Sequence, residues 1–418
     1  MKHRITLALL LAVAGWTVAQ DKTAEITITG GKTDALHPVI KVPVPEAFAK
    51  FKGVEISGAE TFGQKGPFPG QIVLVPSLHS GAKAAELIFT LPEVKAGATG
   101  TLTAKFSANA IAAKEAFAWK DADGEAPVLT YSEKDVLKYV RPKFDPAATP
   151  PKQSPIANPT IKVYHHLFDS TGKVQLTNGT EGQFPHHRGI YFGFNNISYD
   201  GKKADVWHCR TGESQQHAGF LSHTAGPVLG RHRVQVAWNG QDGKPFAEEH
   251  RELTVYPLEK GWLVEFESMV KTERPKVQLD GDPQHAGFHF RAAQDVEKNH
   301  KNETYFLRPD GKGELGKEKN WEKGKAMDHK NLAWNAMSFV DGDKRYTTLY
   351  LDHPANPKEA RQSERTYGRI GTYFEYDLTP EAPLKIKYRL WVQEGELTGE
   401  QAKAISEAFV SGPTAVLK

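Results

Sequence analysis

The sequence predicts an all-β fold in which a small immunoglobulin-like sandwich is followed by a large antiparallel β-sandwich. Short runs rich in Val, Ile, Thr, Tyr and Phe recur along most of the chain between turn residues, and the 418 residues include 37 Gly and 26 Pro. Only one segment near the end, "TGEQAKAISEAFVSG", has the spacing of an amphipathic helix. The length is sufficient for two domains with large cores.

The first residues have the three-part pattern of a secretory signal. Lys2 and Arg4 precede an apolar run from Ile5 to Val13, and small residues follow. The run is shorter than the roughly 20 apolar residues that cross a bilayer, so we expect a cleaved signal peptide over residues 1–19 rather than a membrane anchor. No later segment is apolar enough to span a membrane. The mature protein is therefore expected in the periplasm or outside the cell.

Charge and cysteine content narrow the function classes. Without Lys2 and Arg4 the 53 basic residues become 51, against 50 acidic residues. This balance provides no basic field for binding nucleic acid. The only cysteine, Cys209, excludes intramolecular disulfides, and a lone thiol is more typical of a small buried residue than of a nucleophile.

Residues 20–112 are expected to form the immunoglobulin-like accessory module. Six short alternating or apolar runs, punctuated by Gly and Pro, have the spacing of a small sandwich. These runs are "AEITITGG", "HPVIKVPVP", "GVEISG", "GQIVLVPS", "AAELIFTLP" and "GTLTAKF". They contain no cluster of reactive side chains, so a structural or recognition role is predicted.

Residues 113–400 are expected to form the large antiparallel sandwich, and residues 401–418 a C-terminal helix. Strand-like runs alternate with turns almost to the end of the chain. Among them "WNGQDG" indicates a hairpin, because Asn-Gly and Asp-Gly tolerate positive φ. The Pro-rich stretch 144–159 is interpreted as a surface loop inside this domain rather than as a linker.

Histidines are concentrated in the large domain. Eleven of the 17 lie within 125 residues, at positions 165, 166, 186, 187, 208, 217, 223, 232, 250, 285 and 289. Histidine titrates near neutral pH and is the commonest metal ligand, so this concentration indicates proton-transfer or metal chemistry.

Strand geometry predicts that some of these histidines share a polar face. In "HAGFHFR" successive side chains point to opposite sides of a strand. One face would carry His285, Gly287, His289 and Arg291, and the other Ala286, Phe288, Phe290 and Ala292. Two imidazoles and a guanidinium around a Gly are typical of the floor of a cleft, and a hydrogen-bonded face without a ligand is the alternative.

The motif "FPHHRGIYFGFN" is interpreted in the same way. If a strand begins near His187, then His187 and Tyr191 share one face while Arg188 and Phe192 share the other. The Gly at position 189 suggests a close approach of the backbone to a neighbour. Adjacent histidines can then reach a ligand and a supporting partner, and Arg188 is alternatively a loop residue paired with a carboxylate.

Three further segments supply candidates for the same site. They contribute Trp207 and His208 from "DVWHCR", Glu249 from "EEHREL" and His353 from "YLDHPANP". A fourth, "RTYGRIG", contributes Arg365 and Tyr367. An aromatic ring such as that of Trp207 can stack on a sugar, and it can equally be a core residue.

Together, "PHHRG", "DVWH", "QHAGFHFRAA", "LDHPANP" and "RTYGRIGTYFEYDL" resemble a family of exported bacterial proteins known as DUF6807 and often labelled "methane oxygenase PmoA". The similarity covers about Phe117 to Gln393 and leaves the N-terminal module outside. The membrane-bound subunit of that name spans the bilayer several times, and this chain does not, so methane oxidation is not expected. The resemblance implies an exported β-rich domain similar to those encoded among sugar-degrading functions. By analogy, its architecture is compared with mutarotase-like supersandwiches.

The predicted function is that of a carbohydrate-active enzyme that binds a sugar or glycoside in a His- and Arg-rich cleft. His187 and His289 are the candidates for proton transfer, Glu249 is the alternative acid or base, and Arg291 would stabilise negative charge. Substrate binding is assigned to His186, Arg188, Trp207, His208, His285, His353, Arg365 and Tyr367. Because histidines outnumber plausible acid pairs, lyase or epimerase chemistry is favoured over hydrolysis.

Two alternatives stay open. One is a non-catalytic glycan-binding or cell-surface protein, and the other is an enzyme in which several imidazoles ligate a divalent metal ion. The chain lacks the HExxH, CxxC, Walker A and G-x-S-x-G motifs. Sequence alone leaves the substrate, the metal and the oligomeric state unassigned.

Overall fold

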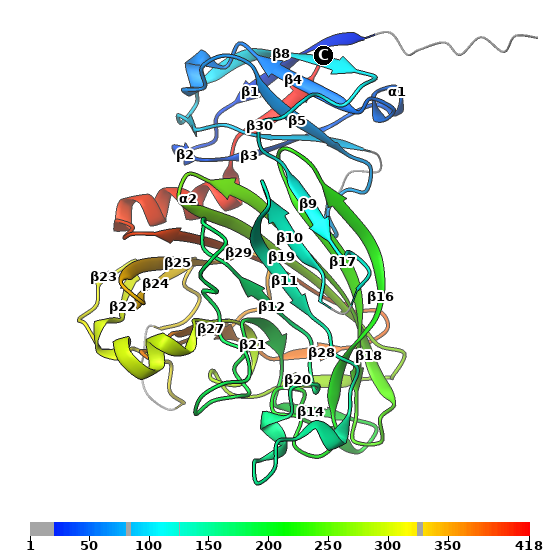
Figure 1. The fold of residues 1–418 in the computed structure, drawn as a ribbon, viewed down its shortest axis with the longest axis vertical. Helices are drawn as coiled ribbons and strands as arrows, with labels where there is room; N and C mark the ends of the chain where they lie inside the picture. Colours follow the sequence, from blue (N-terminus) through cyan, green and yellow to red (C-terminus); the bar gives the residue numbers. More distant parts are fainter. Residues whose placement is uncertain (1–20, 81–84, 125, 324–328) are drawn as a thin grey trace, which may run out of the picture.

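The structure, a computed structural model, describes residues 21–80, 85–124, 126–323 and 329–418. It consists mainly of antiparallel sheets (Figure 1), which confirms the expected all-β class. A small unit of blue and cyan strands forms one end of the molecule, and the remaining strands form a larger unit. The predicted signal peptide, residues 1–19, lies outside the described residues.

The small unit is a seven-stranded sheet that curls until its two end strands lie side by side. In spatial order its strands are β3 (Val39–Pro43), β6 (Glu86–Thr90), β5 (Phe68–Val73), β4 (Gly53–Ser57), β8 (Thr99–Ser107), β1 (Lys22–Thr29) and β30 (Thr414–Leu417). Beside it are the ladder of β2 (Ala35–Leu36) with β7 (Glu93–Val94) and the short helix α1 (Glu46–Ala49). Alternate apolar residues point inwards, and Ile26, Val54, Leu87 and Leu102 form part of a fully buried core.

Helix α2 (Gly399–Ser411) ends earlier than the helix expected over residues 401–418. Its start is fixed by a capping box: the Thr398 hydroxyl accepts a hydrogen bond from Gln401 N at 3.1 Å, and the Gln401 side chain accepts one from Thr398 N at 3.0 Å. Its apolar face is buried in a cluster that also contains residues of both units.

The last residues correct the expected C-terminal helix, because they form a strand. β30 pairs antiparallel with β1, with Ile26 opposite Leu417 and Thr29 opposite Thr414. The run "TAVL" carries too little pattern to reveal a partner almost four hundred residues away in sequence. The small unit therefore contains both ends of the described chain (Figure 1).

The large unit is an antiparallel sandwich, as expected. Its eight-stranded sheet contains β26 (Arg361–Arg365), β27 (Arg369–Tyr373), β21 (Gly287–Arg291), β13 (Ile190–Gly193), β12 (Tyr164–Leu167), β11 (Lys134–Val140), β10 (Val128–Tyr131) and β9 (Phe117–Lys120). Its nine-stranded sheet contains β16 (Ser214–Ala225), β17 (Gly230–Asn239), β18 (Pro245–Leu258), β19 (Gly261–Lys271), β29 (Leu384–Glu394), β25 (Lys344–Asp352), β24 (Trp334–Asp341), β22 (Tyr305–Arg308) and β23 (Gly311–Lys312). A four-stranded sheet contains β15 (Lys202–Ala204), β14 (Asn196–Tyr199), β20 (Val277–Asp280) and β28 (Tyr376–Leu378).

Aromatic side chains fill the space between the two large sheets. Phe288 on β21 stacks on Tyr388 of β29, with ring centroids 4.8 Å apart, and lies 4.3 Å from Phe266 of β19. Phe192 on β13 packs against Phe266 and Trp238. All five rings are fully buried, so they fix how β13 and β21 face the opposite sheet.

The small unit packs directly on the nine-stranded sheet. Val73 from the small unit shares an apolar cluster with Leu229 from the large unit and with residues of α2. An ion pair between Lys41 Nζ and Glu265 Oε2, 3.0 Å long, crosses the same contact. The two units are therefore held together by apolar packing, by ion pairing and by the returning C-terminal segment.

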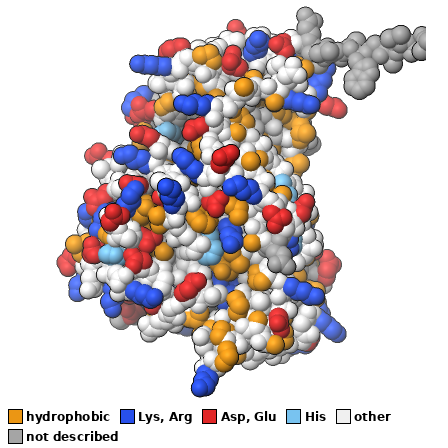
Figure 2. All heavy atoms as spheres, viewed as in Figure 1, with side chains coloured by type: hydrophobic (Ala, Val, Ile, Leu, Met, Phe, Trp, Pro, Cys, Tyr) orange, Lys and Arg blue, Asp and Glu red, His pale blue; other side chains and the backbone are white. Residues whose placement is uncertain are grey.

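No helix among the described residues has the length and apolar composition needed to cross a bilayer. On the face shown in Figure 2, basic and acidic side chains are interspersed, without a large patch of one sign. This distribution agrees with the near balance of 53 basic and 50 acidic residues.

Deleting residues 412–418 is expected to destabilise the protein. The deletion removes β30, exposes the edge of β1 and uncovers apolar residues of the small unit. Lost ladder hydrogen bonds and buried area predict a decrease on the order of 2–4 kcal/mol in the free energy of unfolding, measured by urea denaturation. Val416→Ser is the control, because this side chain is 61% exposed. An unchanged urea midpoint after the deletion would contradict the role assigned to β30.

Candidate functional site

Four imidazoles from three separate loops meet beside the eight-stranded sheet. His186 and His187 lie in the turn before β13, His208 lies in the loop after β15, and His285 lies in the turn before β21. β13 and β21 are hydrogen-bonded neighbours, with Tyr191 opposite His289. The pairing of these two strands therefore brings segments about a hundred residues apart to one place.

The entrance to β13 differs from the sequence interpretation. His187 N donates to Phe184 O at 3.0 Å, which makes a turn, and ladder pairing begins only at Ile190. The predicted close approach at Gly189 is present: its φ is +42°, and a Cβ there would lie 2.1 Å from the carbonyl oxygen of His165. Only glycine fits this position, because any side chain there would collide with the neighbouring backbone. Regular strand pairing therefore begins after Gly189.

The four rings are in contact with one another. Ring centroids lie 4.2 Å apart for His186 and His187, 4.8 Å for His186 and His208, 4.6 Å for His208 and His285, and 5.3 Å for His187 and His285. One ring nitrogen from each of His186, His187 and His285 lies within 4.8 Å of the others. Three nitrogen donors this close can share one metal ion with bonds of about 2.0–2.1 Å after small side-chain rotations.

Two of the four imidazoles are oriented by carboxylates three residues earlier in the chain. His208 Nδ1 lies 2.8 Å from Asp205 Oδ2, and His285 Nδ1 lies 3.0 Å from Asp282 Oδ1. Asn195 Nδ2 in turn donates to Asp282 Oδ2 at 2.8 Å. A carboxylate on Nδ1 fixes the tautomer, so Nε2 of both rings carries the free lone pair that a metal or a proton needs.

His186, His187 and His208 are held in the neutral form. Burial, followed by the charge of Lys162, lowers the pKa of His186 to about 2, and burial lowers the pKa of His187 well below its ordinary value. Burial also lowers the pKa of His208, and the Asp205 carboxylate opposes this shift. The Nδ1 atoms of His186 and His187 are buried without a hydrogen-bond partner. Neutral imidazoles with unpartnered nitrogens are what metal ligation requires.

The cluster reaches solvent on one side. The side chain of His285 is 23% exposed and that of Asp282 is 44% exposed, whereas His186 and His187 are buried. A small ligand can therefore approach across His285, with the other imidazoles beneath it.

Lys162 joins the two loops that carry three of these histidines. Its buried ammonium donates to the carbonyl oxygens of His186, at 2.6 Å, and Trp207, and it lies 4.1 Å from the centre of the Tyr191 ring. Burial lowers the pKa of Lys162 to about 7, and the positive charge of Arg188 adds to this shift. The residue thus fixes the site through backbone contacts and is itself closed to solvent.

The alternation predicted along β21 is confirmed, but the polar face is covered. Phe288 and Phe290 point into the core, and His289 and Arg291 lie on the opposite face. His289 is 2% exposed and packs against Trp207, with centroids 4.6 Å apart. Its Nδ1 accepts a hydrogen bond from Arg369 Nη1 at 2.9 Å, so Nε2 is protonated and donates to Ala286 O at 2.8 Å. With both nitrogens engaged, this ring supports the site and does not exchange protons with a ligand.

Arg291 and Tyr367 lie beside the cluster. The guanidinium of Arg291 forms an ion pair with Glu297 at 2.5 Å and covers one face of the Tyr367 ring at 4.7 Å. Phe184 stacks on Tyr367 with centroids 4.6 Å apart, and Tyr367 lies 6.2 Å from the ring of His187. Both Phe184 and Tyr367 are partly exposed, so they form an aromatic rim next to the four histidines.

Arg188 and Glu249 have structural roles that correct their assignment to a substrate site. Arg188 is 1% exposed and donates to backbone carbonyls, among them Asn158 O at 2.7 Å and Pro185 O at 2.8 Å, so it fastens the Pro-rich loop to the His turn. Glu249 is fully buried in the nine-stranded sheet and accepts hydrogen bonds from Arg251 and from Trp238. Neither side chain has an atom left for a substrate.

Three other candidates also lie elsewhere or have another role. His353 packs against Phe409 of α2 with centroids 5.2 Å apart, and Arg365 forms an ion pair with Glu318 at 2.9 Å. Trp207 is 1% exposed, so it lines the cluster from inside and presents no open face to a sugar.

Cys209 is the buried residue that its isolation in the sequence suggested. Burial raises the pKa of its thiol to about 12, so the thiolate is absent at neutral pH. Its thiol lies 3.4 Å from the carbonyl oxygen of Val206, within the loop that carries His208. It therefore acts as a packing residue there.

A second group of histidines belongs to the core of the sandwich. His165 and His232 face each other from opposite sheets, with their Nε2 atoms 2.9 Å apart. His165 stacks on Tyr139 at 4.7 Å and His232 stacks on Trp119 at 5.1 Å. Both imidazoles are fully buried, and this arrangement is a polar link between sheets rather than a binding site.

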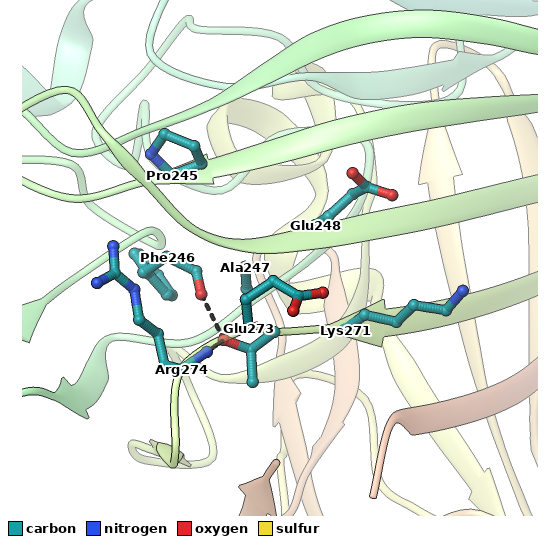
Figure 3. A pocket seen from close by; sticks show the side chains of 8 residues that line it. Pro245, Phe246, Ala247, Glu248, Lys271, Glu273 and Arg274 are labelled. Atoms are coloured by element: carbon teal, nitrogen blue, oxygen red, sulfur yellow. Dashed lines mark hydrogen bonds between the residues drawn. The ribbon is translucent and has the colours of Figure 1, made fainter. Parts of the chain in front are cut away.

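A pocket of about 350 Å³ at the start of β18 and the end of β19 contains none of the four clustered histidines (Figure 3). It is lined by Pro245, Phe246, Ala247, Glu248, Lys271, Thr272, Glu273 and Arg274. Thr272 Oγ1 donates to Phe246 O at 2.7 Å, and the side chains of Lys271 and Arg274 extend in opposite directions. The lining residues do not converge on a common point, so we place the candidate site at the histidine cluster.

Several important residues of the cluster were missed from the sequence. Asp205 and Asp282 share a signal that was present, since "DVWH" and "DPQH" have the same D-x-x-H spacing. Lys162, in the loop before β12, left no comparable signal, because an isolated basic residue is ordinarily exposed. Arg369 belongs to "RTYGRIG", but nothing in that motif indicates its burial. Their burial depends on loops that pack over them.

These features define an antiparallel β-sandwich with a buried, carboxylate-oriented histidine cluster at the edge of one sheet. The chain belongs to DUF6807, a family of unknown function whose sequence model matches residues 126–407. The match confirms the family resemblance and includes the whole cluster. A search of curated protein sequences gave no match.

Acidic pH is expected to destabilise the fold through the His165–His232 pair. Burial lowers the pKa of His232 to about 3 and that of His165 well below its ordinary value. An unfolded histidine titrates near pH 6.5, so below that pH the unfolded chain binds more protons, and stability is lost as pH falls. Each such histidine predicts a slope of about 1.4 kcal/mol per pH unit between pH 6.5 and the folded pKa.

Urea denaturation between pH 7.5 and pH 5.0, in the presence of chelator so that no metal contributes, measures this slope. His300→Gln serves as control, because this side chain is partly exposed and paired with Asp295 and Glu303. A midpoint that stays constant over this range would be inconsistent with buried neutral imidazoles.

Proposed function

We propose that the protein is a metal-dependent enzyme that acts on a sugar or glycoside, with a divalent ion held by His186, His187 and His285. The observation that carries this proposal is the convergence of three ring nitrogens within 4.8 Å, one of them on a ring oriented by a carboxylate. Imidazole ligands suit zinc, copper, iron and nickel. Three protein ligands leave one coordination position for water or substrate, as in catalytic zinc sites.

His208 is the proposed proton-transfer group beside the ion. Asp205 engages its Nδ1 at 2.8 Å, so Nε2 is the nitrogen that exchanges a proton with substrate or with water. Its ring lies 4.8 Å from that of His186 and 4.6 Å from that of His285. This assignment replaces His187, which becomes a ligand, and His289, whose two nitrogens are engaged.

The aromatic rim supports a sugar as the substrate. Phe184 and Tyr367 are partly exposed next to hydrogen-bonding imidazoles, and such a surface suits the C–H face of a sugar ring. Asp205 and Asp282 are both engaged by histidines, which argues against a mechanism that depends on two free carboxylates. Lyase or epimerase chemistry is therefore favoured over hydrolysis.

Elemental analysis of the mature protein, prepared without a histidine tag, tests the metal site. We expect about one equivalent of a divalent transition metal, removed by chelator and restored by zinc. His285→Gln removes a ligand and should abolish stoichiometric binding. Asp282→Asn keeps the imidazole of His285 but removes the carboxylate that orients it, so zinc binding should weaken roughly 10–100-fold. His353→Gln is the control, because this histidine packs against α2.

Turnover on a panel of sugars and glycosides tests the enzyme assignment. Activity should disappear with the metal and return with it. A wild-type protein that binds no metal at saturating zinc would contradict the proposal. Binding of both metal and sugar without turnover in any assay would instead indicate a glycan-binding protein.

A further inference from the structure

Arg369 is a buried cation without a carboxylate partner. It is fully buried on β27, beneath the aromatic rim, and its guanidinium donates to His289 Nδ1 at 2.9 Å, Ser363 Oγ at 2.9 Å and the Tyr367 hydroxyl at 3.2 Å. Among the described residues no carboxylate forms an ion pair with it. Glu318 acts on it only from a distance and is itself paired with Arg365. Burying a charge without an ion-pair partner is energetically unfavourable, and a negatively charged ligand bound nearby would compensate for the charge of Arg369.

Three of the four buried cations around the cluster have no ion pair with a carboxylate among the described residues. The four are Lys162, Arg188, Arg291 and Arg369; Arg291 is paired with Glu297, whereas Glu181 and Glu318 act on Arg188 and Arg369 only from a distance. Lys162 and Arg188 donate to backbone carbonyls and not to acids. A divalent ion on neutral imidazoles adds two positive charges.

Tyr367 connects Arg369 to the aromatic rim beside the site. Because its oxygen accepts a hydrogen bond from Arg369 Nε at 3.2 Å, its own O–H is left to donate, and the adjacent guanidinium strengthens that donor. Its ring forms the rim with Phe184, close to His187. The hydroxyl is therefore a charge-assisted donor on a partly exposed side chain next to His187, one of the proposed metal ligands.

We infer that the ligand of this site is an anionic sugar, with a carboxylate or phosphate group held by the Tyr367 hydroxyl and by the positive field of the cluster. The inference rests on the proposed function and names its substrate class. Tyr367 is the residue that contacts the anionic group, and Arg369 is a positioning residue that acts through it. Neutral sugars share the stacking surface but leave the positive charge uncompensated, so they bind more weakly.

Matched sugar pairs test this inference by calorimetry on the zinc-loaded full-length mature protein at constant ionic strength. The pairs are glucose with glucuronate, galactose with galacturonate and mannose with mannuronate, and glucose 6-phosphate and acetate are added as separate probes. At least one acid is expected to bind ten times more tightly than its neutral partner. A preference for glucose 6-phosphate over the acids would assign a phosphorylated sugar, and acetate as tight as the best sugar acid would overturn the sugar class.

Tyr367→Phe and Arg369→Gln separate recognition from folding. Each should reduce the ratio of anionic to neutral affinity at least fivefold, while zinc content stays unchanged. Arg361→Gln is the matched control, because this arginine lies on the adjacent strand and is balanced by Glu359 and Glu375. If Arg369→Gln does not fold, the Tyr367→Phe variant alone tests the inference, since it removes only the hydroxyl oxygen and keeps the aromatic ring.

The two proposals fail in different ways. Zinc binding without any preference for anionic sugars, or with a preference that Tyr367→Phe leaves intact, overturns the present inference alone. A preference for anionic sugars in a protein that binds no zinc overturns the metal centre and leaves the Tyr367–Arg369 recognition standing. Absence of binding to every sugar acid and to glucose 6-phosphate overturns the inference.

Discussion

The strict alternation of side chains along β21 is the constraint on which the site depends. Phe288 is stacked between Tyr388 and Phe266 in the core, and burial of one such side chain contributes roughly 1.5–3 kcal/mol. The strand cannot rotate without losing this packing. His289 and Arg291 are consequently held on the opposite face. The core thus positions the inner wall of the histidine cluster.

The site also depends on backbone carbonyl groups of the surrounding loops, which bind two buried basic side chains. Arg188 and Lys162 are buried cations that bind carbonyl oxygens of the Pro-rich loop, the His turn and the loop of Trp207. Peptide dipoles satisfy their hydrogen bonds but do not cancel their charge. The hydrogen bonds of these two side chains therefore hold the loops in place. Their positive charge still acts on a ligand in the poorly solvated site. Burial, together with the charge of Lys162, also keeps His186 neutral, so Lys162 affects both the position and the protonation of this residue.

The sequence allowed prediction of the fold class and of one half of the site. Periodicity of two identified His289 and Arg291 as a polar face, and the histidine-rich turns contributed His186, His187 and His285. It assigned Glu249 to acid–base chemistry in the cleft, because alternation shows which side chains share a strand face but not what covers that face. The side chain is fully buried in the nine-stranded sheet and bonded to Arg251 and Trp238. Arg188 was misassigned because its partners are carbonyls, which every residue has. The pairing of β30 with β1 was not predictable, since strand partners far apart in sequence leave no local pattern.

The position of β30 has a mechanical consequence. Lys22 and Leu417 lie toward the same end of an antiparallel pair, so a force that separates the two termini opens the ladder one hydrogen bond at a time. Unzipping in this direction is the weak mode of a sheet, and shear along the strands is the strong one. Once β30 detaches, α2 is the next element under tension, and it packs on the nine-stranded sheet. The joint between the chain ends is therefore the point at which the molecule yields first when it is stretched by its termini.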